Sequence, residues 1–204
     1  ALNTYLECKL RFYLKYVAGL QTPEEVSAEI DSITFGDIFH KSAEYIYKDL
    51  TQHGSLITKD AIEALMKDEV RLESYVDKAF KELFFHIEMD EKPEYNGTQL
   101  INSAVIIRYI KQLLRIDRQY APFTYVASEK SVSEQVSIHT PSGDFKSRIG
   151  GKIDRLDQKD DTLRIVDYKT GGEPKNPANV ASLFIPDKNR SGYVFQTFLY
   201  ASIM

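Results

Sequence analysis

The chain has 204 residues, which is enough for one domain or for a core with one large insertion. Hydrophobic residues make up 43% and charged residues 27%, proportions that are ordinary for a globular protein. The net charge of −4 argues against a protein that coats duplex nucleic acid through a general basic field, although it is compatible with a local basic groove.

No apolar run approaches the ~18 residues that a membrane span needs, and no secretory signal is visible, so we expect no membrane partner. A single cysteine, Cys8, excludes a disulfide within the chain and fits a reducing cytoplasm. The sequence starts without Met and stops at Met204 in an apolar helical run, which indicates a domain excised from a longer protein.

The first 120 residues are predicted to be mostly helical. Apolar residues recur at helical spacing in four stretches, which predicts helices over Leu2–Leu20, from near Thr34 to Leu50, over Thr58–Met89 and over Gln99–Tyr120. The last of these carries a basic face of Arg108, Lys111, Arg115 and Arg118. Solvation is the more ordinary explanation of that face, and the wall of a nucleic-acid channel is the alternative.

From Pro122 onward the pattern changes to one typical of a small sheet followed by a helix. Alternating and β-branched runs predict strands over Thr124–Ser128, Val132–Ile138, Phe145–Leu156 and Leu163–Thr170. An irregular stretch follows, and Ser191–Met204 is predicted to be the last helix. We therefore expect an α/β fold in which the first and last helices flank the sheet.

Two acidic residues and a lysine are predicted to meet at one end of the last two strands. Asp167 and Lys169 share a face of their strand while Tyr168 points the opposite way, and Asp154 ends the preceding strand. A short polar turn makes these strands an antiparallel hairpin. An isolated Asp-x-Lys is usually a surface ion pair, but neighbouring carboxylates repel unless a cation lies between them, so this arrangement favours a divalent cation.

Two other side chains are candidates for the same site. His40 follows Phe35 and Gly36 on the second predicted helix, although a lone histidine is usually structural. Glu129 precedes Asp154 by one strand and is a possible third acidic group, with solvation on an edge strand as the favoured explanation.

These residues resemble the core of the PD-(D/E)XK nuclease superfamily, in its RecB/AddB-type exonuclease branch, which is related to the CRISPR-associated adaptation exonucleases. Four stretches carry the resemblance in the order found in that branch, and together they span almost the whole chain: Leu2–Tyr16, Phe35–His40, Gly151–Gly171 and Gln196–Tyr200.

The resemblance implies a restriction-endonuclease-like core, in which a small mixed sheet is flanked by helices. It predicts one nuclease domain over residues 1–204, with a helical insertion at 41–120 and a catalytic sheet and Gln-x-x-x-Tyr helix at 121–204.

The resemblance also implies a metal-dependent deoxyribonuclease, most simply an exonuclease on single-stranded DNA within a recombination-repair helicase–nuclease. Asp154 and Asp167 would ligate Mg²⁺ or Mn²⁺. The backbone carbonyl of Tyr168 and the imidazole of His40 would complete the protein ligands.

The remaining roles concern the attacking water, the phosphate and the DNA strand. Lys169 would position the attacking water and offset phosphate charge, and Gln196 and Tyr200 would line the groove. Further contacts to nucleic acid are expected from the basic residues Lys152, Arg155 and Lys175.

In relatives, a cysteine at the position of Cys8 ligates an iron–sulfur cluster together with three cysteines that follow the nuclease core. A single thiolate cannot hold such a cluster, so we expect one only in a longer chain; within this chain, a small buried apolar residue is the ordinary role. Two alternatives to a nuclease stay open: a catalytically silent nucleic-acid-binding or scaffolding domain of the same fold, and a hydrolase of another phosphoester.

Overall fold

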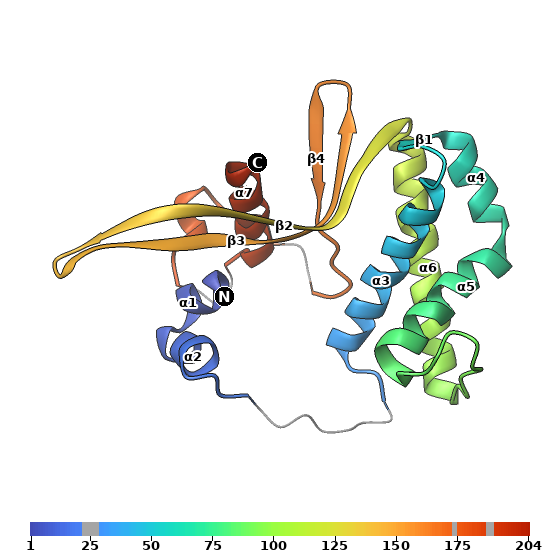
Figure 1. The fold of residues 1–204 in the computed structure, drawn as a ribbon, viewed down its shortest axis with the longest axis horizontal. Helices are drawn as coiled ribbons and strands as arrows, with labels where there is room; N and C mark the ends of the chain where they lie inside the picture. The colour runs from blue at the N-terminus through green and yellow to red at the C-terminus, as the bar shows by residue number, and fades with distance from the viewer. Residues whose placement is uncertain (22–28, 173–174, 187–189) are drawn as a thin grey trace. The chain divides into compact units, whose positions relative to one another are not determined.

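A computed structural model describes residues 1–21, 29–172, 175–186 and 190–204 (Figure 1). The chain divides into two compact units. The terminal unit comprises Ala1–Ser27, Val132–Gly151 and Gly172–Met204, and the central unit comprises Ala28–Ser131 and Lys152–Gly171. The division falls within two long strands, and the predicted arrangement of a single domain with an insertion at 41–120 stays a prediction.

The central unit contains most of the helices. They are α3 (Ser32–Leu50), α4 (Lys59–Lys67), α5 (Glu69–Phe80), the π-helix η2 (Lys81–Phe85) and α6 (Gly97–Tyr120). The predicted boundary at residue 41 therefore lies inside α3. Asn96 begins α6 through a capping box with Gln99, in which each side chain accepts from the other residue's backbone N–H.

The predicted helix over Thr58–Met89 is interrupted. Thr58 caps α4 as expected, but Asp68 leaves the helical conformation at φ −95° and ψ 84°. Its carboxylate accepts from the backbone N–H of Arg71 at 3.0 Å and so begins α5. The short acidic side chain offers the backbone a capping bond in place of a continued helix, which the apolar spacing alone does not reveal.

The predicted helix over Leu2–Leu20 is also divided, into α1 (Leu2–Glu7), α2 (Lys9–Phe12) and the π-helix η1 (Tyr13–Val17). Cys8 separates the first two, with an extended backbone at φ −157° and ψ 108°. Its sulfur accepts from the N–H of Arg11 at 3.5 Å. The side chain is exposed rather than buried, so the expectation of a small core residue is wrong.

The α/β class is confirmed, with a four-stranded sheet in the order β1-β2-β3-β4. The strands are β1 (Leu56–Ile57), β2 (Phe123–Thr140), β3 (Gly143–Lys159) and β4 (Thr162–Val166). The pairings of β1 with β2 and of β3 with β4 are antiparallel, so the sheet is antiparallel where a mixed sheet was expected. Two strands predicted separately form the single strand β2, and β4 ends before Asp167.

The core of the central unit lies where α3, α5 and α6 meet the sheet. Its completely buried side chains include Ile38, Ala43, Ile62, Leu72, Val76, Phe80, Ile106, Ile110 and Leu114. Burial of such apolar side chains contributes ~1.5–3 kcal/mol each, so this cluster supplies the main stabilisation of the unit.

Charged side chains are buried beside this core. Arg155 of β3 forms two hydrogen bonds to Asp117 of α6, at 2.7 and 2.9 Å, and lies 3.1 Å from Asp157. Arg164 of β4 bonds to both carboxylates, and the Tyr47 hydroxyl donates to Asp117. Burial opposes ionisation of Asp117, but the hydrogen bonds and charge of Arg155 outweigh it and lower the pKa of that carboxyl.

Replacing Asp117 by Asn should destabilise the fold strongly. Arg155 is only 1% exposed and would keep its charge without its principal counterion. Breaking such a buried pair costs about 3–5 kcal/mol, and urea unfolding measures the loss. The control is Glu69→Gln, because Glu69 is 69% exposed in its ion pair with Lys111 and its loss should be barely measurable. Equal small effects from both variants would contradict a structural role for the buried pair.

Candidate metal centre

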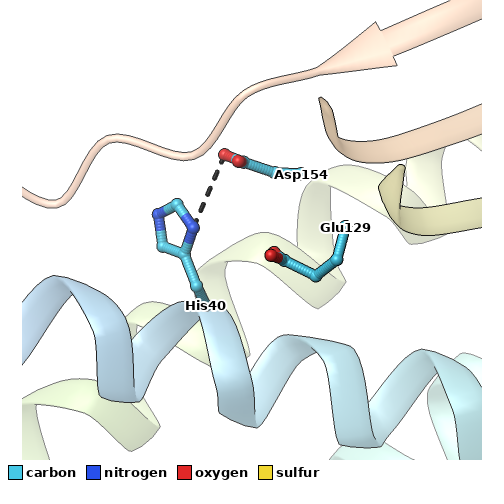
Figure 2. A group of neighbouring side chains, drawn as sticks. All are labelled: His40, Glu129 and Asp154. Atoms are coloured by element: carbon cyan, nitrogen blue, oxygen red, sulfur yellow. Dashed lines mark ion pairs between the residues drawn. The ribbon is translucent and has the colours of Figure 1, made fainter. Parts of the chain in front are cut away.

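Three side chains from three elements of the central unit converge. His40 comes from α3, Glu129 from β2 and Asp154 from β3 (Figure 2). One potential ligand atom from each lies within 4.8 Å of the others, and among the described residues this is the group of three or more that could hold a metal. We call it the metal group.

His40 is oriented by the backbone after β4. Its Nε2 lies 3.2 Å from the carbonyl oxygen of Tyr168, and its Nδ1 lies 3.6 Å from Oδ2 of Asp154 (Figure 2). A carbonyl oxygen can only accept, so Nε2 carries the proton in this bond. In the neutral imidazole Nδ1 then has a lone pair directed toward the acidic side of the group, which is the state that binds metals.

Asp154 is held by the same peptide segment. The backbone N–H of Tyr168 donates to its Oδ2 at 2.7 Å. Burial raises the pKa of Asp154, and the nearby Asp167 charge raises it further, whereas the Tyr168 hydrogen bond and His40 oppose the shift. A bound cation would stabilise the ionised form of such a buried carboxylate.

Glu129 joins the group because the backbone of β2 turns at its position. Its φ of 52° is a left-handed value within an extended strand, uncommon for a residue with a side chain. Such local strain is typical of functional positions. Its carboxylate also forms an ion pair with Lys152. The structure thus places Glu129 near His40 and Asp154, and its role as a ligand stays a prediction; its position in the sequence, one strand before Asp154, is the signal that points to it.

Asp167 and Lys169 lie beyond the end of β4 rather than on it. The Lys169 ammonium is 2.5 Å from Oδ2 of Asp167 and 3.4 Å from the carbonyl oxygen of Tyr168. Both side chains influence the pKa of Asp154, with opposite signs. The structure thus brings this pair into the electrostatic surroundings of Asp154, but Asp167 is not a member of the metal group.

The metal group fits a divalent cation in chemistry and in spacing. Carboxylate oxygens suit Mg²⁺ and Mn²⁺, and an imidazole favours Mn²⁺. Two ligands at about 2.1 Å from one ion lie at most about 4.2 Å apart, a limit that His40 and Asp154 already satisfy at 3.6 Å. The ligand atom of Glu129 lies within 4.8 Å of the other two.

Arg155 does not contact solvent and is not a nucleic-acid contact. The prediction that it binds nucleic acid is wrong, because its guanidinium is buried against Asp117 and lies 4.1 Å from the ring centre of Tyr47. Alternation along β3 explains the error, because Arg155 faces away from the side that its neighbour Asp154 occupies.

Gln196 and Tyr200 lie together on α7 (Gly192–Ile203) in the terminal unit. Gln196 donates through Nε2 to the Tyr200 hydroxyl at 2.8 Å. Tyr200 is 4% exposed and packs on Gly151, where an added Cβ would lie 2.6 Å from the hydroxyl oxygen. The glycine is thus required by this packing, and groove lining by the two side chains stays a prediction.

The other predicted contacts are exposed or paired. Lys175 is exposed, with its backbone N–H donating to the Tyr193 hydroxyl. On the basic face of α6, Lys111 pairs with Glu69 and Arg118 with Glu63, so half of that face serves contacts within the helical region. Among the described helices, none is long and apolar enough to cross a bilayer.

A comparison with protein families decides the class of the molecule. The model described as the PD-(D/E)XK nuclease superfamily matches residues 1–204. The chain belongs to this superfamily. A similar protein is one of the subunits of an ATP-dependent helicase/deoxyribonuclease from Carboxydothermus hydrogenoformans, 27% identical over 180 residues. The match covers 83% of this chain but 16% of that relative, so the nuclease-superfamily chain corresponds to a small part of it.

Glu129 should be needed for tight cation binding. Glu129→Gln removes one anionic ligand from the metal group and should weaken Mn²⁺ binding by about tenfold or more, measured by calorimetric titration. Glu134→Gln is the matched control, because Glu134 is exposed on the same strand outside the group. Equal affinities for all three proteins would show that Glu129 is not a ligand.

Asp154 should bind its proton unusually tightly when no metal is present. Its pKa is raised, so its carboxyl carbon should titrate above the ~3.9 typical of an unperturbed aspartate. Mg²⁺ binds the ionised form, so adding it should move the midpoint to lower pH. NMR titration of the aspartate carboxyl carbons with and without Mg²⁺ measures both effects, and a midpoint unaffected by Mg²⁺ would exclude Asp154 as a ligand.

Proposed function

We propose that this chain is a Mg²⁺- or Mn²⁺-dependent nuclease domain that hydrolyses DNA phosphodiester bonds, as an exonuclease on single strands. The observation that carries the proposal is the convergence of His40, Glu129 and Asp154, with Lys169 beside them, in a member of a nuclease superfamily. The lysine matters because three anionic or neutral ligands alone do not distinguish a catalytic site from a storage site for cations.

In this proposal His40, Glu129 and Asp154 hold the cation and Asp167 adjusts to join them, while the Tyr168 carbonyl stays on Nε2 of His40 and is not a ligand. When bound, the cation supplies Lewis-acid polarisation of the phosphate and lowers the pKa of bound water. The Tyr168 peptide keeps Asp154 oriented through its N–H and keeps the proton of His40 on Nε2 through its carbonyl.

Lys169 acts on the reacting groups rather than on the cation. A protonated lysine offers three donors and no lone pair, so it cannot be a ligand. Its ammonium is held by Asp167 at 2.5 Å, and the side chain is 45% exposed, so it can reach a bound phosphate or orient a water. Positive charge aimed at the developing anionic phosphate is the form of stabilisation that phosphoryl transfer requires.

The contacts to DNA and the protein partner follow from the same proposal. Lys152, Lys175, Gln196 and Tyr200 would contact single-stranded DNA, without Arg155. The relative's name joins a helicase to a deoxyribonuclease, so we propose a helicase, on the same chain or a separate one, as the partner and a cytoplasmic setting. Cys8 would ligate an iron–sulfur cluster only with cysteines from a longer chain, because this sequence supplies one thiolate.

Lys169→Met should separate cleavage from metal binding. We expect Mn²⁺ affinity close to that of the unchanged protein and cleavage slowed by about 10²–10³-fold, because one charged donor to the transition state is lost. Asp154→Asn should lose both properties. The assay is digestion of 5′- and 3′-labelled single- and double-stranded DNA in Mg²⁺ and in Mn²⁺.

Two outcomes would reject parts of this proposal. If Lys169→Met loses metal affinity as severely as Asp154→Asn, then the lysine acts on the cation site and not on the reaction. If the unchanged chain binds DNA and Mn²⁺ but cuts no strand under any of these conditions, it is the catalytically silent module.

A further inference from the structure

Lys152 carries a positive charge into the metal group. It lies on β3 two residues before Asp154, so the two side chains share a face of the strand. Its ammonium forms an ion pair with Oε2 of Glu129. Lys152, Glu129 and His40 all line one cavity of about 360 Å³ within the central unit.

A second lysine lines the same cavity but has different partners. The ammonium of Lys41 lies 2.9 Å from a carboxylate oxygen of Glu82 and 3.4 Å from one of Glu44. Neither glutamate belongs to the metal group. The cavity thus offers a comparison between two lysines of the same charge, one bound to a member of the group and one bound elsewhere.

The carboxylate of Glu129 has room for two positive partners. It has two oxygens with about four acceptor positions, and Lys152 is placed on Oε2. One oxygen of the same carboxylate lies within 4.8 Å of ligand atoms of His40 and Asp154. The left-handed backbone at Glu129 determines the direction in which its side chain leaves β2. The Lys152 side chain is 58% exposed and has less influence on that direction.

We propose that Lys152 supplies a fixed second positive charge to the metal centre. It holds one oxygen of Glu129, limits the group to one divalent cation and weakens the binding of that cation by like-charge repulsion. This inference rests on the proposed function, and it assigns to Lys152 a charge-setting role in addition to the proposed contact to DNA.

Removing Lys152 changes the affinity for a divalent cation through two opposing contributions. Losing a positive charge next to the group favours binding of a divalent cation, whereas a less restrained Glu129 disfavours that binding. The charge contribution should win, because the repulsion acts at short range between a single and a double positive charge. The restraint from a long, largely exposed lysine is weak. We expect Mn²⁺ to bind about tenfold more tightly to Lys152→Met.

Calorimetric titration of the full chain with Mn²⁺ tests the proposal. The unchanged protein should bind one ion. Lys152→Met should bind it about tenfold more tightly or accept a second ion, and the gain should shrink at high salt. Lys152→Arg keeps the charge and should stay within about threefold of the unchanged protein. Lys41→Met, the matched control from the same cavity, should change the affinity much less than Lys152→Met.

The outcomes separate this inference from the proposed function. A purely structural role for Lys152 would weaken binding when the residue is replaced, so weaker or unchanged Mn²⁺ affinity in Lys152→Met overturns the inference while the metal centre stands. An equal gain in Lys41→Met also overturns it, because any nearby charge would then suffice. An unchanged protein that binds no Mn²⁺ refutes the metal centre, and with it both the proposed function and this inference.

Discussion

The buried ion pair between Arg155 and Asp117 fixes the strand on which the metal group depends. Arg155 follows Asp154 directly, so anchoring its guanidinium to α6 also determines where the preceding carboxylate emerges. Its charge is further surrounded by the rings of Tyr47, from α3, and of Tyr168, which follows β4. One desolvated cation therefore ties together the elements that present His40 and Asp154. Because an unpaired buried charge is costly, alternative packings of these elements are disfavoured.

The sequence predicts which residues form the site better than it predicts how those residues are arranged. Asp154 and His40 can be selected from motif order, and the structure brings them together. Glu129 could not be selected in the same way, since no sequence pattern signals the left-handed backbone at its position. Helix spacing likewise located the apolar faces but not the interruptions at Cys8 and Asp68, where one residue departs from helical angles.

Arg155 shows how strand alternation limits a prediction made from residue type alone. Arg155 is a basic residue next to Asp154 in the sequence, and a basic residue near a nuclease site suggests a contact to DNA. Strand alternation, applied to neighbouring positions, already places it on the face opposite Asp154. Its partner Asp117 lies 38 residues away in sequence, so a buried ion pair between them could not be anticipated without the tertiary structure. By the same alternation Lys152, two residues before Asp154, lies on the Asp154 face of the strand.

The segment after β4 contributes through its backbone as much as through its charged side chains. Tyr168 donates its N–H to Asp154 and offers its carbonyl to His40, so one residue orients two members of the metal group. Its ring lies 5.6 Å from that of Phe39 and 5.4 Å from that of His40, both in edge-to-face contact, and the side chain is buried. A packed aromatic ring restricts rotation of the adjoining peptide units. The buried ring of Tyr168 therefore helps to hold the backbone between Asp167 and Lys169 in position.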